Sequence, residues 1–423
     1  MRKLVLLALF MGLVLMPFVQ AKPHNNGYGS HPAVATDGFD NGYYLTVWVG
    51  SSAEGVYGAL YYVYNNTLKK SFRITNYAAS VVDMASRMVD ATQPEDNIYF
   101  VVWKRDGDGG LYGVLLDYEG NTLSEIKRYD SGFQVNGNNL AVTYGNGYFV
   151  IVYQPSGQDY IKSIRYVVVD PKDGAETDRG FLYTGGINPD NPLIRIAYEK
   201  DYLIFGTIAS TGDNVVFIQA KVNNGRLEIG PRILLFSTSK RVSNLVIAPA
   251  REGGFLVGYF YDEKWRVGKV DSSLRFTDDI ATYGRYHPME YGDMALIWDR
   301  NGINTPYIIF AYSDRNNANN YDIVLQKLKT SGDPIDDPGN DTMVISSDRK
   351  TYRFNYPAIV AKPYGSPSAY IITFEDEEDS SILSNEYDDS FREISPQNPV
   401  PFFSNLAIAT VALLGILWFF RRN

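Results

Sequence analysis

The residues of this sequence best suited to bind a ligand lie in two kinds of predicted loop. One kind is aromatic and basic, as in residues 283–287, and the other is acidic, as in residues 375–379. Aromatic rings stack on the apolar faces of sugars, and carboxylates accept hydrogen bonds from hydroxyl groups. We therefore predict a glycan or peptide site formed by Tyr283, Arg285, Tyr286, His287, Glu375, Asp376 and Glu377. The simpler alternative is that such rings pack between sheets, because the chain contains 33 tyrosines.

A metal site is suggested most directly by Asp106 and Asp108, which alternate with glycines. Calcium loops combine alternate carboxylates with a glycine turn and a later acidic ligand. That later ligand is missing here, so a solvated turn is the favoured interpretation and no cofactor is predicted. The acidic run at 375–379 needs converging oxygens from other loops to hold a cation, and it is interpreted as a solvent-facing loop.

Catalytic motifs are scarce in the sequence. The chain has no cysteine and three histidines, His24, His31 and His287, which excludes a thiol nucleophile and a site of several histidines. No Ser-x-Asp-x-Gly-x-Thr-Trp turn of the sialidase type is present. A glycosidase needs two carboxylates, and any two acidic loops could supply them without a recognisable motif. The sequence therefore leaves enzymatic activity undecided and favours a protein without one.

The elements that would position these loops repeat along the chain. A cassette of roughly fifty residues occurs seven times, which indicates stacked or radial modules. Each cassette begins with a short strand of small and branched residues, at 32–35, 88–91, 140–142, 193–197, 245–248, 294–297 and 357–361. A second strand, rich in aromatics and apolar on both faces, follows at 43–48, 98–103, 148–153, 202–207, 255–260, 307–312 and 369–374.

Two further strands complete each cassette. The third alternates in polarity, as at 57–61, and commonly ends in a turn such as Asp173-Gly174 that tolerates positive φ. A fourth, more polar strand follows, as at 71–74. Four antiparallel strands in each of seven units predict an all-β, seven-bladed β-propeller. Six or eight blades remain alternatives, because the fourth and fifth units lack the Tyr-Gly pair and the Trp.

The order of the strands in each cassette leads to three further predictions. In such a blade, the loop between strands two and three shares a face with the connection to the next blade, which places both candidate loop sets together. Residues 330–348 are predicted to form an extended hairpin loop on the rim. The ring is closed either by residues 391–394, which complete the last blade, or by residues 25–30, which add a strand to it.

The cassette resembles the repeat of secreted bacterial and archaeal propellers, which read roughly YLVVW…DIYGQRLD..G. The resemblance spans residues 31–395 and is carried by Trp48 or Trp103, an acidic loop and a Tyr-Gly pair. The stretch from Tyr312 to Gln326 is the best match. The resemblance implies the fold, and it implies no single function because such propellers serve many.

The two ends of the chain predict export and anchoring. Residues 1–21 have the charged start, apolar stretch and small-residue cleavage site of a signal peptide. Residues 22–396 form the propeller and 397–401 a linker. Residues 402–420 are long and apolar enough to span a membrane, and 421–423 form a basic cytoplasmic tail. This end also resembles sorting tags that are cleaved and replaced by a lipid, so retention of the helix is left open.

The charge of the chain narrows the choice of partners. The formal net charge is −9, and removal of Arg2, Lys3, Arg421 and Arg422 leaves −13 on the exported part. Such a surface disfavours nucleic acid and anionic lipid. We predict a cell-surface propeller, anchored through its C-terminal helix, that binds an envelope protein or glycan without catalysis. The alternatives are an extracellular glycoside hydrolase or lyase and a structural component of a surface layer.

Overall fold

The computed structural model describes most of the predicted propeller. The described residues are 24–36, 42–50, 55–63, 67–87, 93–157, 163–184, 194–199, 202–208, 214–237, 242–250, 254–271, 275–283, 287–297, 306–315, 321–333, 342–345, 354–361, 370–376 and 381–387. The predicted signal peptide, linker, membrane segment and tail lie outside these residues. Within the described residues, no helix has the length and apolar character needed to cross a membrane.

The strands follow one another in groups of four. Blade 1 holds β1 (His24–Thr36), β2 (Tyr43–Gly50), β3 (Val56–Tyr62) and β4 (Leu68–Thr75). Blade 2 holds β5 (Ala79–Ser86), β6 (Ile98–Arg105), β7 (Leu111–Asp117) and β8 (Lys127–Arg128), with the short helix η3 (Pro94–Asp96). Blade 3 holds β9 (Val135–Gly145), β10 (Tyr148–Pro155), β11 (Ile164–Val169) and β12 (Glu176–Tyr183).

The remaining blades repeat this order. Blade 4 holds β13 (Ile194–Glu199), β14 (Tyr202–Ile208), β15 (Asn214–Asn223) and β16 (Arg226–Ser237). Blade 5 holds β17 (Val242–Ala250), β18 (Gly254–Tyr261), β19 (Lys264–Val270) and β20 (Phe276–Tyr283). Blade 6 holds β21 (His287–Ile297), β22 (Tyr307–Arg315), β23 (Tyr321–Lys329) and β24 (Thr342–Ile345). Blade 7 holds β25 (Phe354–Ala361), β26 (Tyr370–Asp376) and β27 (Ser381–Tyr387).

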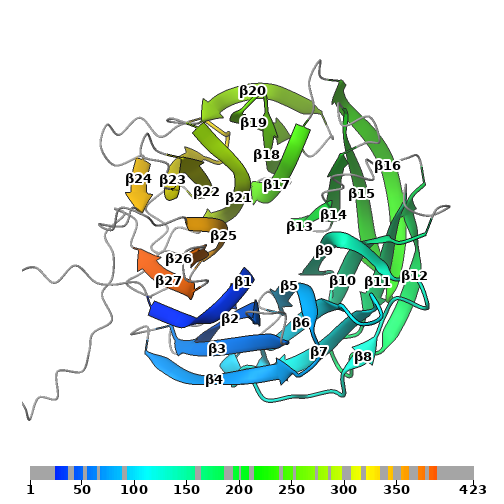
Figure 1. Ribbon diagram of the computed structural model, residues 1–423. Helices are drawn as coiled ribbons and strands as arrows, with labels where there is room; N and C mark the ends of the chain where they lie inside the picture. The colour runs from blue at the N-terminus through cyan, green and yellow to red at the C-terminus, as the bar shows by residue number, and fades with distance from the viewer. Residues whose placement is uncertain are drawn as a thin grey trace, which may run out of the picture.

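These groups form the seven blades of a propeller, as the cassette count predicts. Five sheets have four antiparallel strands each, and a seven-stranded sheet combines blades 7 and 1. Figure 1 shows the sheets arranged around a centre, with β1, β5, β9, β13, β17, β21 and β25 innermost. The described all-β architecture confirms the fold prediction, including the number of blades.

The ring is closed by the first strand of the chain. In β1, residues 24–28 pair with β27 as the outer strand of blade 7, with His24 opposite Ser384 and Tyr28 opposite Ser381. The same strand then shifts register and pairs with β2 as the inner strand of blade 1, with Ala33 opposite Val47. The second of the two predicted closures is therefore confirmed. Residues 391–394 lie outside the described residues.

Apolar packing between neighbouring blades forms the core. Each of the seven junctions contains its own cluster of buried residues, including the junction between blades 7 and 1, where Tyr44, Trp48 and Ile371 meet. Every described residue of β2 and of β26 is buried. This burial explains why the second strand of each cassette is apolar on both faces, since each sheet packs against a sheet on either side.

Inner strands of adjacent blades are also joined by carboxylates at matching positions. Asp83 Oδ2 accepts a hydrogen bond from Val142 N of blade 3 at 2.8 Å. Asp293 Oδ2 accepts one from Ile359 N of blade 7 at 2.9 Å. In both cases the inner edge of the next sheet leaves a backbone N–H without a strand partner, and a half-buried carboxylate accepts its hydrogen bond.

Two sequence predictions are corrected by the structure. The inner strand of blade 2 is β5 (Ala79–Ser86), which pairs with β6, whereas we predicted it at 88–91. Residues 88–91 lie outside the described residues. The segment 330–348, predicted to be a loop, contains β24, which pairs with β23 as the outer strand of blade 6. The apolar residues of β5 join the core clusters on both sides of blade 2, and β24 forms where β23 offers an unpaired outer edge.

Candidate functional site

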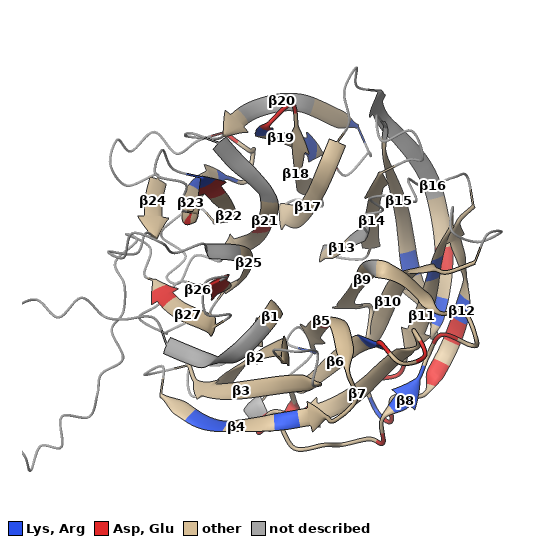
Figure 2. Ribbon diagram, viewed as in Figure 1, with Lys and Arg blue, Asp and Glu red and all other residues tan. Residues whose placement is uncertain are grey.

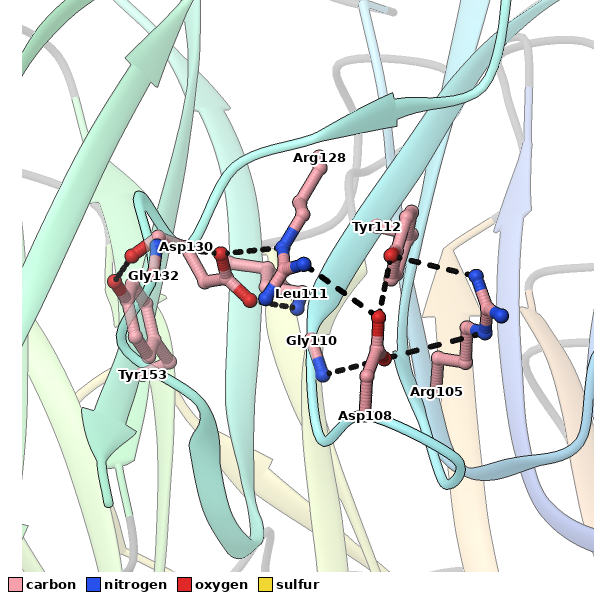
Figure 3. A network of polar contacts seen from close by, with 9 residues as sticks. All are labelled: Arg105, Asp108, Gly110, Leu111, Tyr112, Arg128, Asp130, Gly132 and Tyr153. Carbon is pink, nitrogen blue, oxygen red and sulfur yellow. Dashed lines mark hydrogen bonds and ion pairs between the residues drawn. The ribbon is translucent and has the colours of Figure 1, made fainter. Parts of the chain in front are cut away.

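A network of charged and aromatic side chains lies in blade 2. It consists of Arg105, Asp108, Tyr112, Arg128 and Asp130, which we call the blade 2 cluster (Figure 3). Arg105 ends β6, Asp108 lies in the loop to β7, and Asp130 lies in the connection to blade 3. The loop and the connection share one face of the propeller because strands alternate in direction. We call this side the loop face; it is the face on which the sequence predicted the site.

Asp130 is the buried centre of the blade 2 cluster. Its side chain has no exposed surface, and Oδ1 accepts hydrogen bonds from Arg128 Nε at 2.8 Å and from Gly132 N at 3.0 Å. Oδ2 accepts one from Leu111 N at 3.1 Å. The backbone carbonyl of Asp130 accepts a hydrogen bond from the hydroxyl of Tyr153 in blade 3, with an O–O distance of 3.2 Å. The residue therefore ties the start of β7, the outer strand β8 and blade 3 together.

Asp108 holds the outer part of the cluster. Oδ1 accepts a hydrogen bond from Gly110 N at 3.0 Å, and Oδ2 accepts one from Tyr112 Oη at 2.7 Å. Arg105 and Arg128 approach it at 3.9 and 3.6 Å. Partial burial acts to raise the pKa of Asp108, but the two hydrogen bonds and the two arginine charges outweigh it and lower the pKa. Asp108 is therefore ionised at neutral pH.

The arginines of the cluster lie over aromatic rings. The Arg105 guanidinium is 4.0 Å from the ring centroid of Tyr77 and 5.5 Å from that of Tyr112. Arg128 is 5.8 Å from the same Tyr112 ring. Figure 2 shows basic residues along the outer strands β4 and β8. The carboxylates thus hold two cations and a ring in fixed positions at the edge of the loop face.

Blade 3 has a different arrangement at the position that corresponds to Tyr112. Arg165 stands there, pairs across the sheet with Tyr153 and Phe181, and is only 7% exposed. Its guanidinium lies 4.0 Å from the ring centroid of Phe133 and 4.9 Å from that of Phe181. Nε and Nη1 are buried and have no hydrogen-bond acceptor among the described residues.

A second group of rings lies on the inner strands that surround the centre of the propeller. His31, Tyr356 and Tyr291 stand two residues before Ala33, Ala358 and Asp293, which occupy equivalent places in blades 1, 7 and 6. The ring centroids of His31 and Tyr356 are 4.6 Å apart, and those of Tyr291 and Tyr356 are 4.2 Å apart. This inner aromatic arc crosses the junction at which the ring closes.

Two residues of the inner aromatic arc have unusual backbone angles. His31 and Tyr356 have φ values of 52° and 49°, and each precedes a proline within a register shift. Residues other than glycine seldom adopt such angles, and such strain gathers at functional sites. Burial lowers the pKa of His31, so the ring is neutral at neutral pH.

The predicted site residues are distributed over three blades. Tyr283 is 8% exposed and packs edge-on against Phe310 at 6.1 Å, a core contact. Glu375 and Asp376 are buried at the end of β26, where they pair with Asn355 and Phe354. The interpretation of the acidic run as a solvent-facing loop is therefore wrong for these two residues, because they continue a strand that is covered on both faces. His287 begins β21, opposite Arg315. Arg285, Tyr286 and Glu377 lie outside the described residues, so the joint site of these seven residues stays a prediction.

The two predicted metal ligands lie in different surroundings. Asp106 is exposed, and Asp108 is occupied by hydrogen bonds and arginines. Within the part of the chain that the structure describes, no three acidic or histidine side chains lie close enough to hold a metal ion. The neighbours of Asp108 are cations, which oppose a metal ion at this position.

Sequence reasoning missed the residues that matter most in this part of the loop face. Arg105, Arg128, Asp130 and Arg165 were not selected, because each is an ordinary charged residue near a strand end. A usable signal was the repeated pairing of Tyr in the third strand with Arg in the fourth, as in Tyr57 with Arg73 and Tyr112 with Arg128. In blade 3 the two kinds of residue change places, with Arg165 in the third strand and the aromatic Phe181 in the fourth. This exchange distinguishes Arg165 from the residues at the same position in blades 1 and 2.

Comparisons with known proteins support the fold. No protein-family model and no curated protein matches the chain. Among solved structures, it is similar to a candidate 6-phosphogluconolactonase from Bacteroides fragilis, with 13% identity, a TM-score of 0.51, and coverage of 84% of this chain and 93% of that one.

Two further solved structures are similar at lower identity. A prolyl endopeptidase is 9% identical with a TM-score of 0.50, and the match covers 86% of this chain but 48% of that one. BamB from Moraxella catarrhalis is 9% identical with a TM-score of 0.42, over 83% of this chain and 95% of that one. At such identities the likeness extends to the fold alone.

Proposed function

We propose that this chain is a non-catalytic binding module of the cell surface, and that its loop face binds a glycan or protein of the envelope. The observation that carries the proposal is the blade 2 cluster, in which two carboxylates hold two arginines and a tyrosine in place. Preorganised charged and aromatic groups suit recognition, because little side-chain freedom is lost when a ligand binds.

The protonation of the cluster argues for binding rather than catalysis. A general acid needs a carboxyl group whose pKa is raised towards the working pH. The pKa of Asp108 is lowered instead, and both of its oxygens accept hydrogen bonds. Asp130 is enclosed and accepts three hydrogen bonds. These two carboxylates therefore serve as anchors for the arginines.

The proposed location rests on the sequence. Residues 1–21 and 402–420 suggest export and C-terminal anchoring, with the propeller outside the cell. Protease treatment of intact cells that express the full chain is expected to degrade the propeller and to spare the basic tail. Protection of the propeller in intact cells would contradict the proposed location.

Binding is tested with the full chain in detergent against glycans and proteins extracted from the envelope of the producing cell. Arg105→Ala is expected to weaken binding about fivefold or more, since it removes a cation held at the loop face. The matched control is Lys172→Ala, an exposed cation in the turn between β11 and β12 on the opposite face, which should bind as the wild type does.

The enzymatic alternative predicts a different result in the same samples. Hydrolysis of chromogenic glycosides by the wild type, abolished by Asp108→Asn or Glu375→Gln, would overturn the proposal. Ordered self-assembly of the purified chain, without binding to any envelope fraction, would favour the surface-layer alternative instead.

A further inference from the structure

Arg165 is a buried cation without a counter-ion among the described residues. It is 7% exposed, and neither Nε nor Nη1 has an acceptor there. No described carboxylate lies within ion-pairing distance of it; the ion pairs found involve Lys69, Arg105, Arg128 and Arg179. A buried charge is costly unless it is paired and hydrogen-bonded. The position therefore calls for an anion that the described chain does not supply.

The neighbouring acid does not fill this role. Glu176 forms an ion pair with Arg179 on the same strand. Burial raises the pKa of Glu176, and the Arg179 and Arg165 charges only partly oppose this shift. In blade 2, by contrast, Arg128 has Asp130 at 2.8 Å and Asp108 at 3.6 Å. Among its described residues, blade 3 keeps the cation but places no carboxylate within ion-pairing distance of it.

We propose that Arg165, with Phe133 and Phe181, forms a binding site for the carboxylate of an acidic sugar, such as a uronic acid unit of a glycan. The inference rests on the proposed binding function and names its ligand class. The site lies on the loop face, because Arg165 directly follows the loop between β10 and β11, and Phe133 belongs to the connection from blade 2 to blade 3.

The chemistry of the site favours a carboxylate over other anions. Two rings cover the guanidinium, and its Nε and Nη1 are buried without an acceptor among the described residues. A planar carboxylate accepts two parallel hydrogen bonds from one edge of a guanidinium, so it would supply an acceptor to one of these groups. A phosphate monoester would bring close to two negative charges to one unpaired cation. Phe181 is 37% exposed, so displacement of its ring gives access to the guanidinium and offers an apolar face to the sugar.

An acidic peptide is a less suitable ligand here. A peptide recognised by strand addition needs a regular, unpaired sheet edge. The outer strand β12 shifts register against β11 at both ends and carries Glu176, Asp178 and Arg179 along its length. Bulges and charges of this kind discourage the pairing of a further strand. The exposed ring beside the cation remains, and it suits a sugar.

The test uses titration calorimetry on the full chain in detergent, with a tetramer of galacturonic acid as the probe. The comparison ligands are the same tetramer with its carboxylates reduced to alcohols, and a tetraglutamate peptide. We expect the acidic sugar to bind, the reduced sugar to bind at least about tenfold more weakly, and the peptide to bind more weakly than the acidic sugar. Arg165→Gln should weaken binding of the acidic sugar at least tenfold, while Arg179→Gln should leave it unchanged.

A second variant keeps the test decisive if Arg165→Gln folds poorly. Arg165→Met preserves the apolar contacts and removes the unpaired charge, so its melting temperature without ligand should equal or exceed that of the wild type. Galacturonate should raise the melting temperature of the wild type and not that of Arg165→Met. A melting temperature of Arg165→Met well below the wild type, with an unchanged response to galacturonate, would show a purely structural role.

The outcomes separate this inference from the proposed function. Equal binding of acidic and reduced sugars, or undiminished binding by Arg165→Gln, overturns the carboxylate site but leaves envelope binding intact. Tighter binding of tetraglutamate overturns the sugar assignment. Binding of an envelope fraction that depends on Arg105 and is indifferent to Arg165 likewise overturns this inference alone.

Discussion

The loops between the second and third strands of blades 1 and 2 are closed by equivalent hydrogen bonds but lead to different polar groups. Gly50 N donates to Gly55 O, and Arg105 N donates to Gly110 O, both at 2.9 Å. Behind each loop, a tryptophan stacks on a tyrosine at closely similar distances, 6.1 Å for Trp48 and Tyr57 and 6.4 Å in blade 2. The framework of the two blades is therefore shared.

The difference lies in what holds the arginine of the fourth strand. Arg73 lies over Tyr57 and donates to the backbone carbonyl of Thr75 at 3.2 Å. Arg128 occupies the equivalent place in blade 2 and donates to the carboxylate of Asp130 instead. The propeller thus repeats a ring and a cation, and in blade 2 an Asp two residues later adds a buried carboxylate to the partners of that cation.

The largest expected effect comes from removing the buried anchor. Asp130→Ala leaves three donors and the Arg128 charge without their acceptor, so we expect unfolding free energy to fall by about 3 kcal/mol. Thr75→Ala removes one accepted hydrogen bond, from Tyr77 N at 3.2 Å, and should cost about 1 kcal/mol. Urea unfolding measures both. Equal losses in the two blades would contradict the distinction.

A smaller difference is expected from the arginines. Arg128→Met leaves a buried carboxylate without its cation and should cost about 1.5 kcal/mol, a value reduced because the arginine is partly exposed. Arg73→Met breaks a bond to a backbone carbonyl and should cost about 0.5 kcal/mol. Thermal unfolding of the two variants against the wild type checks the order, and the reverse order would refute it.

Acid should weaken blade 2 through Asp108. The pKa of Asp108 is lower in the folded protein than in the unfolded chain. Its contribution to the free energy of unfolding is therefore fully present above the unfolded pKa of about 3.9, and it is lost as the pH falls through the folded pKa. Because the side chain is a third exposed, the contribution should be about 1 kcal/mol. Asp108→Asn should lose this amount at pH 7 and show a flatter stability profile below pH 4. An unchanged profile would contradict the assignment.

The smallest effect concerns the contact between the two blades. Tyr77 is 54% exposed and lies under Arg105 of blade 2. Tyr77→Ala should lower stability by about 0.5 kcal/mol, since cation–π contacts at exposed sites are weak. Tyr77→Phe keeps the ring and should match the wild type in the same thermal unfolding assay. A loss in the Phe variant would mean that the hydroxyl, not the ring face, matters.

Much of the fold was predictable from the sequence because burial between sheets has a strong local signature. The seven aromatic strands from β2 to β26 were placed correctly, since a strand covered on both faces must be apolar throughout. The inner strand of blade 2 was misplaced, because Ala79–Ser86 and residues 88–91 are similarly small and branched. Pairing with β6 decides that Ala79–Ser86 forms the strand, and that pairing joins residues that are apart in the sequence.

The candidate site was less predictable. The spacing of Asp108 marks it in the sequence, and its residue type indicates a weak metal ligand or a solvated turn. Its actual neighbours include Arg128, which is twenty residues away in the chain and is brought close by the hairpin. Asp130 and Arg165 carry no motif at all. Their importance comes from burial, and burial of a single charged residue leaves no pattern in a sequence.

Periodic apolar strands and glycine turns act locally, so the amino-acid sequence predicts the repeated units, the strand order within them and the face on which the loops gather. Closure of the ring by β1 follows from the tertiary fold instead, since that pairing joins residues about 360 positions apart. The same fold places a carboxylate beside Arg128 and two rings beside Arg165. Charge pairing depends on distance in space, and the chain reveals that distance only when it folds.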